Sequence, residues 1–391
     1  MRTHWRLPRG VDEILPPAAW EFELLRRKVL DVFFSWGFDY VEPPVIEYLE
    51  SLQAGGGEDL DLQTLKVVDQ VTGKQLGIRA DMTSQAARID AHSLITDGVQ
   101  RLCYAGPVVF ANPQIAMTSR VPFKAGAEIF GAANVEADAE IVGLMLESLA
   151  VAEIAEPVLL LGHMGIYQGL VEAMLEDSVL HPKDERALFQ CVQRKSQSDI
   201  SALLKPSELR DLMVRLPTLM GDVQVLHDAT RSLQGAPTKV LQAVGELQRL
   251  ADLVVPRQAT SVRVDVSELS GYGYHNGPVF AVYHPRHGQA LAQGGRYDGI
   301  GEVFGRARSA TGFDVDLKTL IQGNSVHPVI FAPFVDESQR ADLAVAIATL
   351  RHAGHRVRGA LSEHETRPPQ CSQSLEWIEG QWRVTDHAQN V

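Results

Sequence analysis

Apolar residues recur at helical spacing in three parts of the chain. Between residues 18 and 36, large apolar side chains recur at three- and four-residue spacing, and Gly37 follows where a helix usually ends. The same pattern predicts helices over 83–91 and 138–152. Thr83 is a residue type that caps helix N-termini, so we expect its side chain to accept a hydrogen bond from the first turn of its helix.

Short runs rich in β-branched and aromatic residues predict strands between these helices. The runs over 64–71 and 75–79 flank Thr72-Gly73 and predict a hairpin. The runs over 102–110 and 123–130 predict two more strands, joined by a polar loop. Further strands are predicted over 38–45, 158–161, 261–266, 279–283 and 289–292.

The strands occur in blocks and do not alternate regularly with helices. From residue 165 to about 258 the chain has the composition of helices alone, and the glycine run at 55–59 predicts a flexible loop in the first block. A strand, helix and strand over 329–358 predict a small α/β piece of about 65 residues at the end. This order favours an α+β fold over a doubly wound parallel sheet.

Composition and charge exclude several classes of protein. The chain has 391 residues, 45% of them apolar, which suits two or three domains. It has 49 acidic and 36 basic residues, a formal charge of −13, which argues against broad binding of nucleic acid. No segment has the ~20 apolar residues of a membrane span. Cys103, Cys191 and Cys371 show no zinc or redox spacing, so we predict a cytoplasmic protein without disulfides.

Few residues indicate chemistry when each is taken alone. The glycine-rich segment 293–299 lacks the lysine of a phosphate-binding loop, so we interpret it as a tight strand-to-helix turn. The histidines His275, His284 and His287 lack a convincing further ligand, so we predict neither a metal site nor a cofactor. Glu128 lies in an apolar strand, where a charged carboxylate must be paired, and we expect an arginine partner or a cationic ligand.

The order of several short motifs is more specific than any one of them. The chain resembles class II histidyl-tRNA synthetases over about residues 6–320, through RGVDEILPP, RADMTSQAARI, YAGPVVF, GAEIFG, SGYGYHNGPVF, GGRYDGI and a later GF. The resemblance implies an antiparallel class II sheet flanked by helices in a core of residues 1–323, with a helical insertion at about 165–258. It implies that 324–391 form a short α/β domain similar to a truncated anticodon-binding domain.

The chain departs from this family where three arginines are expected. The family's F-R-x-E motif is absent, so that Ala111 stands in the arginine's place, and Ser270 replaces the arginine of R-G-L-D-Y-Y. The third motif should end in E-R, but 314–319 has the sequence DVDLKT. Adenylation develops negative charge that preorganised cations stabilise. We therefore expect no catalytic residues and no enzyme activity in this chain alone.

The amino-acid side of the family's site is better matched. The resemblance assigns Asp81 and Thr83 to the ligand's α-ammonium group and Glu128 to its imidazole. Lys124 stands where the family has a glutamine, and it either meets the ligand's carboxylate or weakens binding. The whole set assigned to histidine binding is Asp81, Thr83, Lys124, Glu128, Tyr274, His275 and Tyr297.

A synthetase-like chain that keeps this pocket but loses adenylation is similar to the regulatory subunits of ATP phosphoribosyltransferase. The resemblance implies that the chain activates a short-form catalytic subunit in the first step of histidine biosynthesis and confers feedback inhibition by histidine. It also implies a dimer, formed through the region 20–47. Two alternatives stay open: a synthetase-derived aminoacyl ligase and a tRNA-sensing module, although the acidic charge disfavours the second. The apolar residues of the predicted dimer region are Phe33, Phe34, Trp36, Phe38 and Tyr40.

Overall fold

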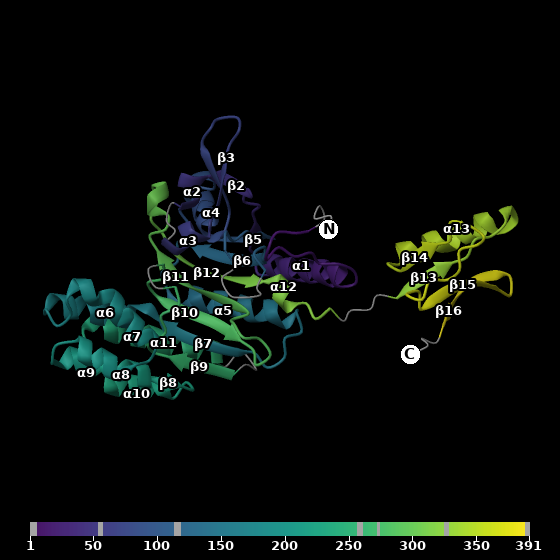
Figure 1. Cartoon of the computed structure of the whole chain (residues 1–391). Coiled ribbons are helices and arrows are strands. Elements are labelled where there is room, and N and C mark those ends of the chain that lie inside the picture. The colour runs from purple at the N-terminus through teal and green to yellow at the C-terminus, as the bar shows by residue number, and fades with distance from the viewer. Residues whose placement is uncertain are drawn as a thin grey trace. The chain divides into compact units, whose positions relative to one another are not determined.

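The chain forms two compact units. The computed structural model describes residues 6–53, 58–112, 119–255, 261–271, 274–323 and 328–387. One unit comprises Met1–Ile14 and Phe22–Ile321, and the other comprises Leu15–Glu21 and Gln322–Val391 (Figure 1). The glycines of the predicted loop at 55–59 lie outside the described residues, and α3 (Glu58–Gln63) begins directly after them.

A nine-stranded sheet is the centre of the first unit. Its strand order is β1-β5-β6-β12-β11-β10-β7-β9-β8, and the pairs from β5 through to β7 are all antiparallel. This mainly antiparallel sheet with flanking helices confirms the predicted α+β class. The strands are β1 (Asp39–Tyr40), β5 (Gln100–Pro107), β6 (Phe123–Phe130), β7 (Val158–His163), β8 (Met220–Gly221), β9 (Ser261–Asp265), β10 (Pro278–Tyr283), β11 (Ala292–Asp298) and β12 (Ser309–Asp316).

One face of this sheet forms the main hydrophobic core. It packs against α1 (Ala18–Ser35) and α5 (Val135–Ala150), with the Phe33 ring edge-on to Phe313. Both helices were predicted from the apolar spacing, and both predictions are confirmed. The sheet residues on this face include Cys103, Ala125, Ala127, Ile129, Phe313 and Val315.

The opposite face carries glycines and polar groups. Because side chains alternate along a strand, Lys124, Gly126 and Glu128 of β6 share this face with Gly312 and Asp314 of β12. Helix α4 (Thr83–Arg88) packs on part of it through a smaller apolar cluster and continues as a π-helix, Ile89–Ser93. The sheet thus separates an apolar core from a polar face.

A helical insertion lies between β7 and β9 (Figure 1). It is helical as predicted, apart from the two-residue β8. Arg296 of β11 forms a buried ion pair with Asp138 of α5 and, at 2.8 Å, a partly exposed one with Glu246 of α11. Breaking a buried pair such as Arg296–Asp138 typically costs ~3–5 kcal/mol, so it fixes α5 to the sheet, and the Glu246 contact adds a link to the insertion. The helices are α6 (Met164–Glu176), α7 (Glu185–Gln193), α8 (Gln197–Leu203), α9 (Glu208–Arg215), α10 (Val225–Ser232) and α11 (Thr238–Val254).

A small three-stranded sheet, ordered β2-β4-β3, precedes β5. Its β3 (Leu65–Val68) and β4 (Gln75–Ile78) form the predicted antiparallel hairpin. The third strand is β2 (Ile46–Tyr48), which is followed by α2 (Leu49–Gln53). After β12, the short helix α12 (Leu317–Leu320) closes the first unit.

The second unit is a four-stranded sheet with one long helix. The predicted elements are found as β13 (Val329–Ala332), α13 (Glu337–His352) and β14 (Arg356–Gly359). The hairpin β15 (Gln373–Ile378) and β16 (Gln381–Asp386) was not predicted, because polar residues on its exposed positions hide the strand pattern. The strand order is β14-β13-β15-β16.

Three local predictions are wrong. Residues 293–299 do not turn into a helix, because Gly294 and Gly295 lie inside β11, where Cβ atoms would overlap the neighbouring strand and the His275 ring. Thr83 is not an N-cap: it is the first helical residue, and its N–H donates to Asp81 Oδ2 at 3.2 Å. The strand expected over 38–45 shortens to the two residues of β1. Among the described residues, no helix is long and apolar enough to cross a membrane.

Candidate functional site

Three glycines form the floor of the polar face. Gly312 faces Glu128 on one side and Gly295 on the other in the strand register. A Cβ at Gly312 would overlap the Glu128 carboxyl, and one at Gly295 would overlap the His275 ring. A Cβ at Gly126 would overlap the Tyr104 hydroxyl. These strands therefore need glycine here, because larger side chains lie flat across the floor.

Glu128 is at the centre of this floor and is only 1% exposed. Tyr104 Oη donates to Glu128 Oε1 at 2.8 Å, and Tyr297 Oη donates to Oε2 at 2.7 Å. Burial raises the pKa of Glu128 to about 8, although both phenol hydrogen bonds oppose the shift. The carboxyl group is thus mostly neutral at pH 7. The expectation of an arginine partner is therefore wrong for the described residues. The hydroxyl groups of Tyr104 and Tyr297 instead bind the uncharged carboxyl group of Glu128.

A chain of hydrogen bonds joins Glu128 to the start of α4. The Tyr104 hydroxyl lies 3.2 Å from Thr83 Oγ1, and Thr83 in turn donates its N–H to Asp81. Four of the predicted residues, Asp81, Thr83, Glu128 and Tyr297, are thus linked. Their link, Tyr104, was missed by the sequence analysis, although it lies in the YAGPVVF motif. Two-residue alternation along β5 is the signal that would have found it.

Tyr274 and His275 complete one wall. The Tyr274 ring centroid lies 5.1 Å from that of Tyr297 and 5.0 Å from that of His275. Burial lowers the pKa of His275 to about 4, so this ring is neutral at pH 7. The Tyr274 hydroxyl is buried and has no hydrogen-bond partner within the described residues. A buried hydroxyl without a partner is a position where a polar ligand group fits.

Lys124 lies at the other end of the floor, among acids. Its Nζ forms an ion pair with Asp314 Oδ1, and its direct partner in the strand register is Asp316. Burial opposes the charge of Lys124, but Asp314 and Asp316 outweigh it and raise the pKa of the lysine. The pKa of Asp81 is raised by burial and by the negative charge of Asp314. Asp314, which the sequence analysis did not name as a site residue, thus pairs with Lys124 and acts electrostatically on Asp81.

The positions of the three expected arginines are occupied by residues with local roles. Ser270 donates its hydroxyl to Glu268 Oε1 at 2.6 Å. In the Asp316 to Thr319 region, Asp316 Oδ1 accepts the N–H groups of Phe123 and Lys318, each at 3.1 Å, and Thr319 donates its hydroxyl to the Asp316 carbonyl at 2.7 Å. Ala111 donates its N–H to a backbone carbonyl at 2.7 Å. Ala111, Ser270 and Thr319 offer no positive charge to a phosphate, and Lys318 is paired with Asp12.

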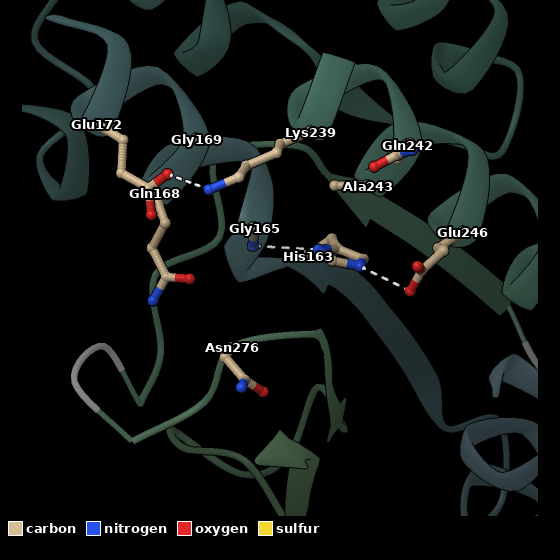
Figure 2. Close-up of a pocket in the computed structure, with 10 residues that line it drawn as sticks. All are labelled: His163, Gly165, Gln168, Gly169, Glu172, Lys239, Gln242, Ala243, Glu246 and Asn276. Carbon is tan, nitrogen blue, oxygen red and sulfur yellow. Dashed lines mark hydrogen bonds and ion pairs between the residues drawn. The ribbon is translucent and has the colours of Figure 1, made fainter. Parts of the chain in front are cut away.

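A separate pocket of about 220 Å³ lies between α6 and α11 (Figure 2). Glu172 and Lys239 pair across it at 2.7 Å, and His163 Nε2 lies 3.4 Å from Glu246. None of the seven predicted residues lines this pocket, which borders the loop after His275 through Asn276. Its charged groups are mutually paired, so it offers no free charge to a ligand.

The remaining histidines do not form a metal site with His275. The rings of His284 and His287 pack against each other, with centroids 5.5 Å apart. Within the described ranges, no group of three or more His, Cys, Asp or Glu residues is arranged to hold a metal ion.

Comparisons with known proteins give one consistent result. A family model described as histidyl-tRNA synthetase matches residues 10–320, and one described as the ATP phosphoribosyltransferase subunit HisZ C-terminal domain matches 327–385. Proteins named ATP phosphoribosyltransferase regulatory subunit are 44% identical in Pseudomonas fluorescens and 45% identical in Thioalkalivibrio sulfidiphilus. The alignments cover 97% of both chains for the first and 98% of this chain and 99% of the relative for the second.

Solved structures show the same fold. An ATP phosphoribosyltransferase regulatory subunit/histidyl-tRNA synthetase from Bacillus halodurans is 25% identical, with a TM-score of 0.83 over 94% of this chain and 95% of that one. A histidyl-tRNA synthetase from Nostoc is 17% identical, with a TM-score of 0.74 over 98% of this chain and 94% of that one. The predicted class II synthetase-like fold is therefore confirmed.

The raised pKa of Glu128 predicts how the stability of the folded chain depends on pH. Its pKa of about 8 lies above the ordinary value of 4.5, so the folded chain holds this proton more tightly than the unfolded chain. The resulting stabilisation is present below pH ~4.5 and is lost as the pH rises through about 8. At ~1.4 kcal/mol per pKa unit it amounts to a few kcal/mol. Urea unfolding at pH 5 and pH 8 should therefore show a larger loss for the wild type than for Glu128→Gln.

Glu140→Gln is the matched control for this prediction. Glu140 is ion-paired with Arg101 outside the polar floor, so this variant should follow the wild type. Equal losses of stability in the wild type and Glu128→Gln would contradict the assignment of a neutral buried acid.

Proposed function

The chain belongs to the family of ATP phosphoribosyltransferase regulatory subunits, and from this premise we propose that it activates a short-form catalytic subunit and makes that enzyme sensitive to histidine. The observation that carries the proposal is the identity of 44–45% with proteins of that name over nearly the whole chain. Both the synthetase-like core and the C-terminal domain are included in that similarity. The proposed location is the cytoplasm, whose reducing conditions suit three buried free cysteines.

The proposed regulatory ligand is free histidine, bound on the polar face of the sheet. Its imidazole would lie against Glu128, which offers a buried acceptor next to two phenols. Its α-ammonium group would approach Asp81 and Thr83 at the start of α4, as the resemblance implies. The unpartnered Tyr274 hydroxyl supplies one more polar contact. This arrangement explains why so many polar groups converge on one face of the sheet.

The chain is proposed to regulate without catalysing a reaction itself. Amino-acid activation places developing negative charge on the α-phosphate of ATP, and several cations are needed there. Ala111 and Ser270 stand where the resemblance expects two of the arginines, and the third is expected in the Asp316 to Thr319 region, whose lysine, Lys318, is paired with Asp12. A nearby arginine, Arg120, is held by the backbone carbonyls of Phe110 and Arg9. These substitutions support a binding role for the old substrate site.

We propose a dimer that forms through the exposed side of α1 and β1. Of the apolar residues in the predicted dimer region, Phe33 and Phe38 belong to the core. Phe34 is 81% exposed and Tyr40 is 48% exposed, so these two are available to a partner. The five apolar side chains were expected to form either an interface or ordinary core, and we propose the exposed Phe34 and Tyr40 as the ones in the interface.

The purified chain should show no histidine-dependent exchange of pyrophosphate with ATP. The reason is that neither Ala111 nor Ser270 is cationic and that Lys318 is already paired with Asp12. The measurement is exchange of labelled pyrophosphate into ATP, with an authentic histidyl-tRNA synthetase as positive control. Exchange clearly above the no-enzyme blank would favour the alternative of an aminoacyl ligase.

Glu128→Gln should raise the histidine concentration needed for half-inhibition of the reconstituted complex about tenfold or more. The amide presents an NH2 group in place of one oxygen of the neutral carboxyl group, so a polar group of the buried contact is left without a partner, which costs ~1–3 kcal/mol. Activation of the catalytic subunit by the variant should persist, because the pocket does not make the subunit contact. Glu140→Gln should match the wild type in both assays. Unchanged inhibition by a folded Glu128→Gln chain would place the histidine site elsewhere.

Phe34→Glu should convert the dimer to a monomer in sedimentation velocity. A buried, unpaired carboxylate at an apolar contact is strongly unfavourable. Val345→Glu is the control, because Val345 is a similarly exposed apolar residue on a helix of the C-terminal unit. A dimer that survives Phe34→Glu would show that this side of α1 is not the interface.

A further inference from the structure

The Lys124–Asp314 ion pair joins two strands on the floor of the site. Along β6, Lys124, Gly126 and Glu128 point to the same face, and the Tyr104 side chain lies over Gly126 between the other two. Lys124 and Glu128 are four strand positions apart, which is about 13 Å between Cα atoms. One end of this stretch has an acid suited to an imidazole, and the other has a lysine and an aspartate that already neutralise each other.

We propose that this ion pair recognises the zwitterionic form of a bound amino acid by exchanging partners. Lys124 leaves Asp314 for the ligand's α-carboxylate, and the ligand's α-ammonium group takes the place of Lys124 beside Asp314 and Asp81. This inference rests on the proposed histidine site and adds to it a mechanism of selection. It assigns Asp314 a role in binding. Of the two roles left open for Lys124, it selects contact with the ligand's carboxylate over weakening of binding.

The charges around Lys124 favour such an exchange. Asp314 pairs with its ammonium group, and the nearby acids Asp316 and Asp81 also raise the pKa of this lysine, so acidic groups outnumber the one cation. A second cation is therefore attracted to the cluster, and an α-ammonium group supplies it. Lys124 has a flexible four-carbon stem, and its side chain is about one-fifth exposed. It can thus swing toward a carboxylate without disturbing β6.

The exchange also explains how the site would reject related molecules. Histidine brings one positive and one negative charge, so Lys124 and Asp314 each regain a partner. Histamine lacks the carboxylate and leaves Lys124 without a new partner, while imidazolepropionate lacks the ammonium and leaves Asp314 unpaired. A half-buried charge left unpaired costs more than an ion pair gains. Selection therefore comes from both charges of the ligand together.

The test is calorimetric titration of the full chain with histidine, histamine and imidazolepropionate. The wild type should bind histidine at least tenfold more tightly than either analogue. Lys124→Met should weaken histidine tenfold or more and leave histamine unchanged, so that the preference between them disappears. Asp314→Asn should remove the preference over imidazolepropionate. Lys318→Met is the matched control, because Lys318 also pairs with an aspartate, Asp12, and should keep both preferences.

The outcomes separate this inference from the function on which it rests. Histidine binding with an unchanged histidine-to-histamine ratio in Lys124→Met would overturn the exchange and leave the histidine site standing. Absence of histidine binding to the wild type, alone and in the reconstituted complex, would overturn both. If Lys124→Met does not fold, Lys124→Gln replaces it in the test, because glutamine is the residue type that the synthetases have at this position. Lys124→Gln should lose the same preference for histidine over histamine.

Discussion

The uncharged Glu128 carboxyl group is the constraint on which the polar face of the sheet depends. A charged carboxylate at this depth would need a buried cation, whereas a neutral acid needs only hydrogen-bond partners. Tyr104 supplies one from the neighbouring strand β5, and Tyr297 supplies the other from β11, across β12. The acid can lie flat only because Gly312 has no side chain beneath it. One buried group thus accounts for the glycine on β12, the two phenols and the lack of an arginine beside them.

At the other end of the floor, around Lys124, the polar groups are charged. There, charge is kept and is compensated inside the chain, by the pairing of Lys124 with Asp314. A site for ATP must leave cations free for phosphate, but here Asp314 and Asp316 take up the positive charge of Lys124 before a ligand arrives. In the function proposed above, the same face would bind an amino acid without offering free cations to a triphosphate.

The sequence predicted those parts of the structure that follow from local periodicity or from ordered motifs. The helices α1, α5 and α13 each have an apolar stripe, and the hairpin β3–β4 has a turn signal between two strand patterns. The strand β11 was missed because its glycines are required by close neighbours from β12 and from His275, and neither is visible in the sequence. Tyr104 and Asp314 were missed as site residues, although two-residue alternation along β5 and β12 places both on the polar face. Their roles depend on strand register, which places them beside Glu128 and Lys124 from distant parts of the chain.

A regulator must convert occupancy of a site into a change elsewhere, and β11 is placed to do this. Tyr297 points to the polar face and bonds Glu128, while the adjacent Arg296 points to the other face and pairs with Asp138 and Glu246. These two residues are adjacent on one backbone, so β11 connects the polar face directly to the ion pairs on the core side. Those pairs connect the sheet to α5 and to the helical insertion. Allosteric control needs only that the ligand stabilise one arrangement over another, and in the proposed function the neighbouring residues on opposite faces of β11 would be the link between the ligand and the helices.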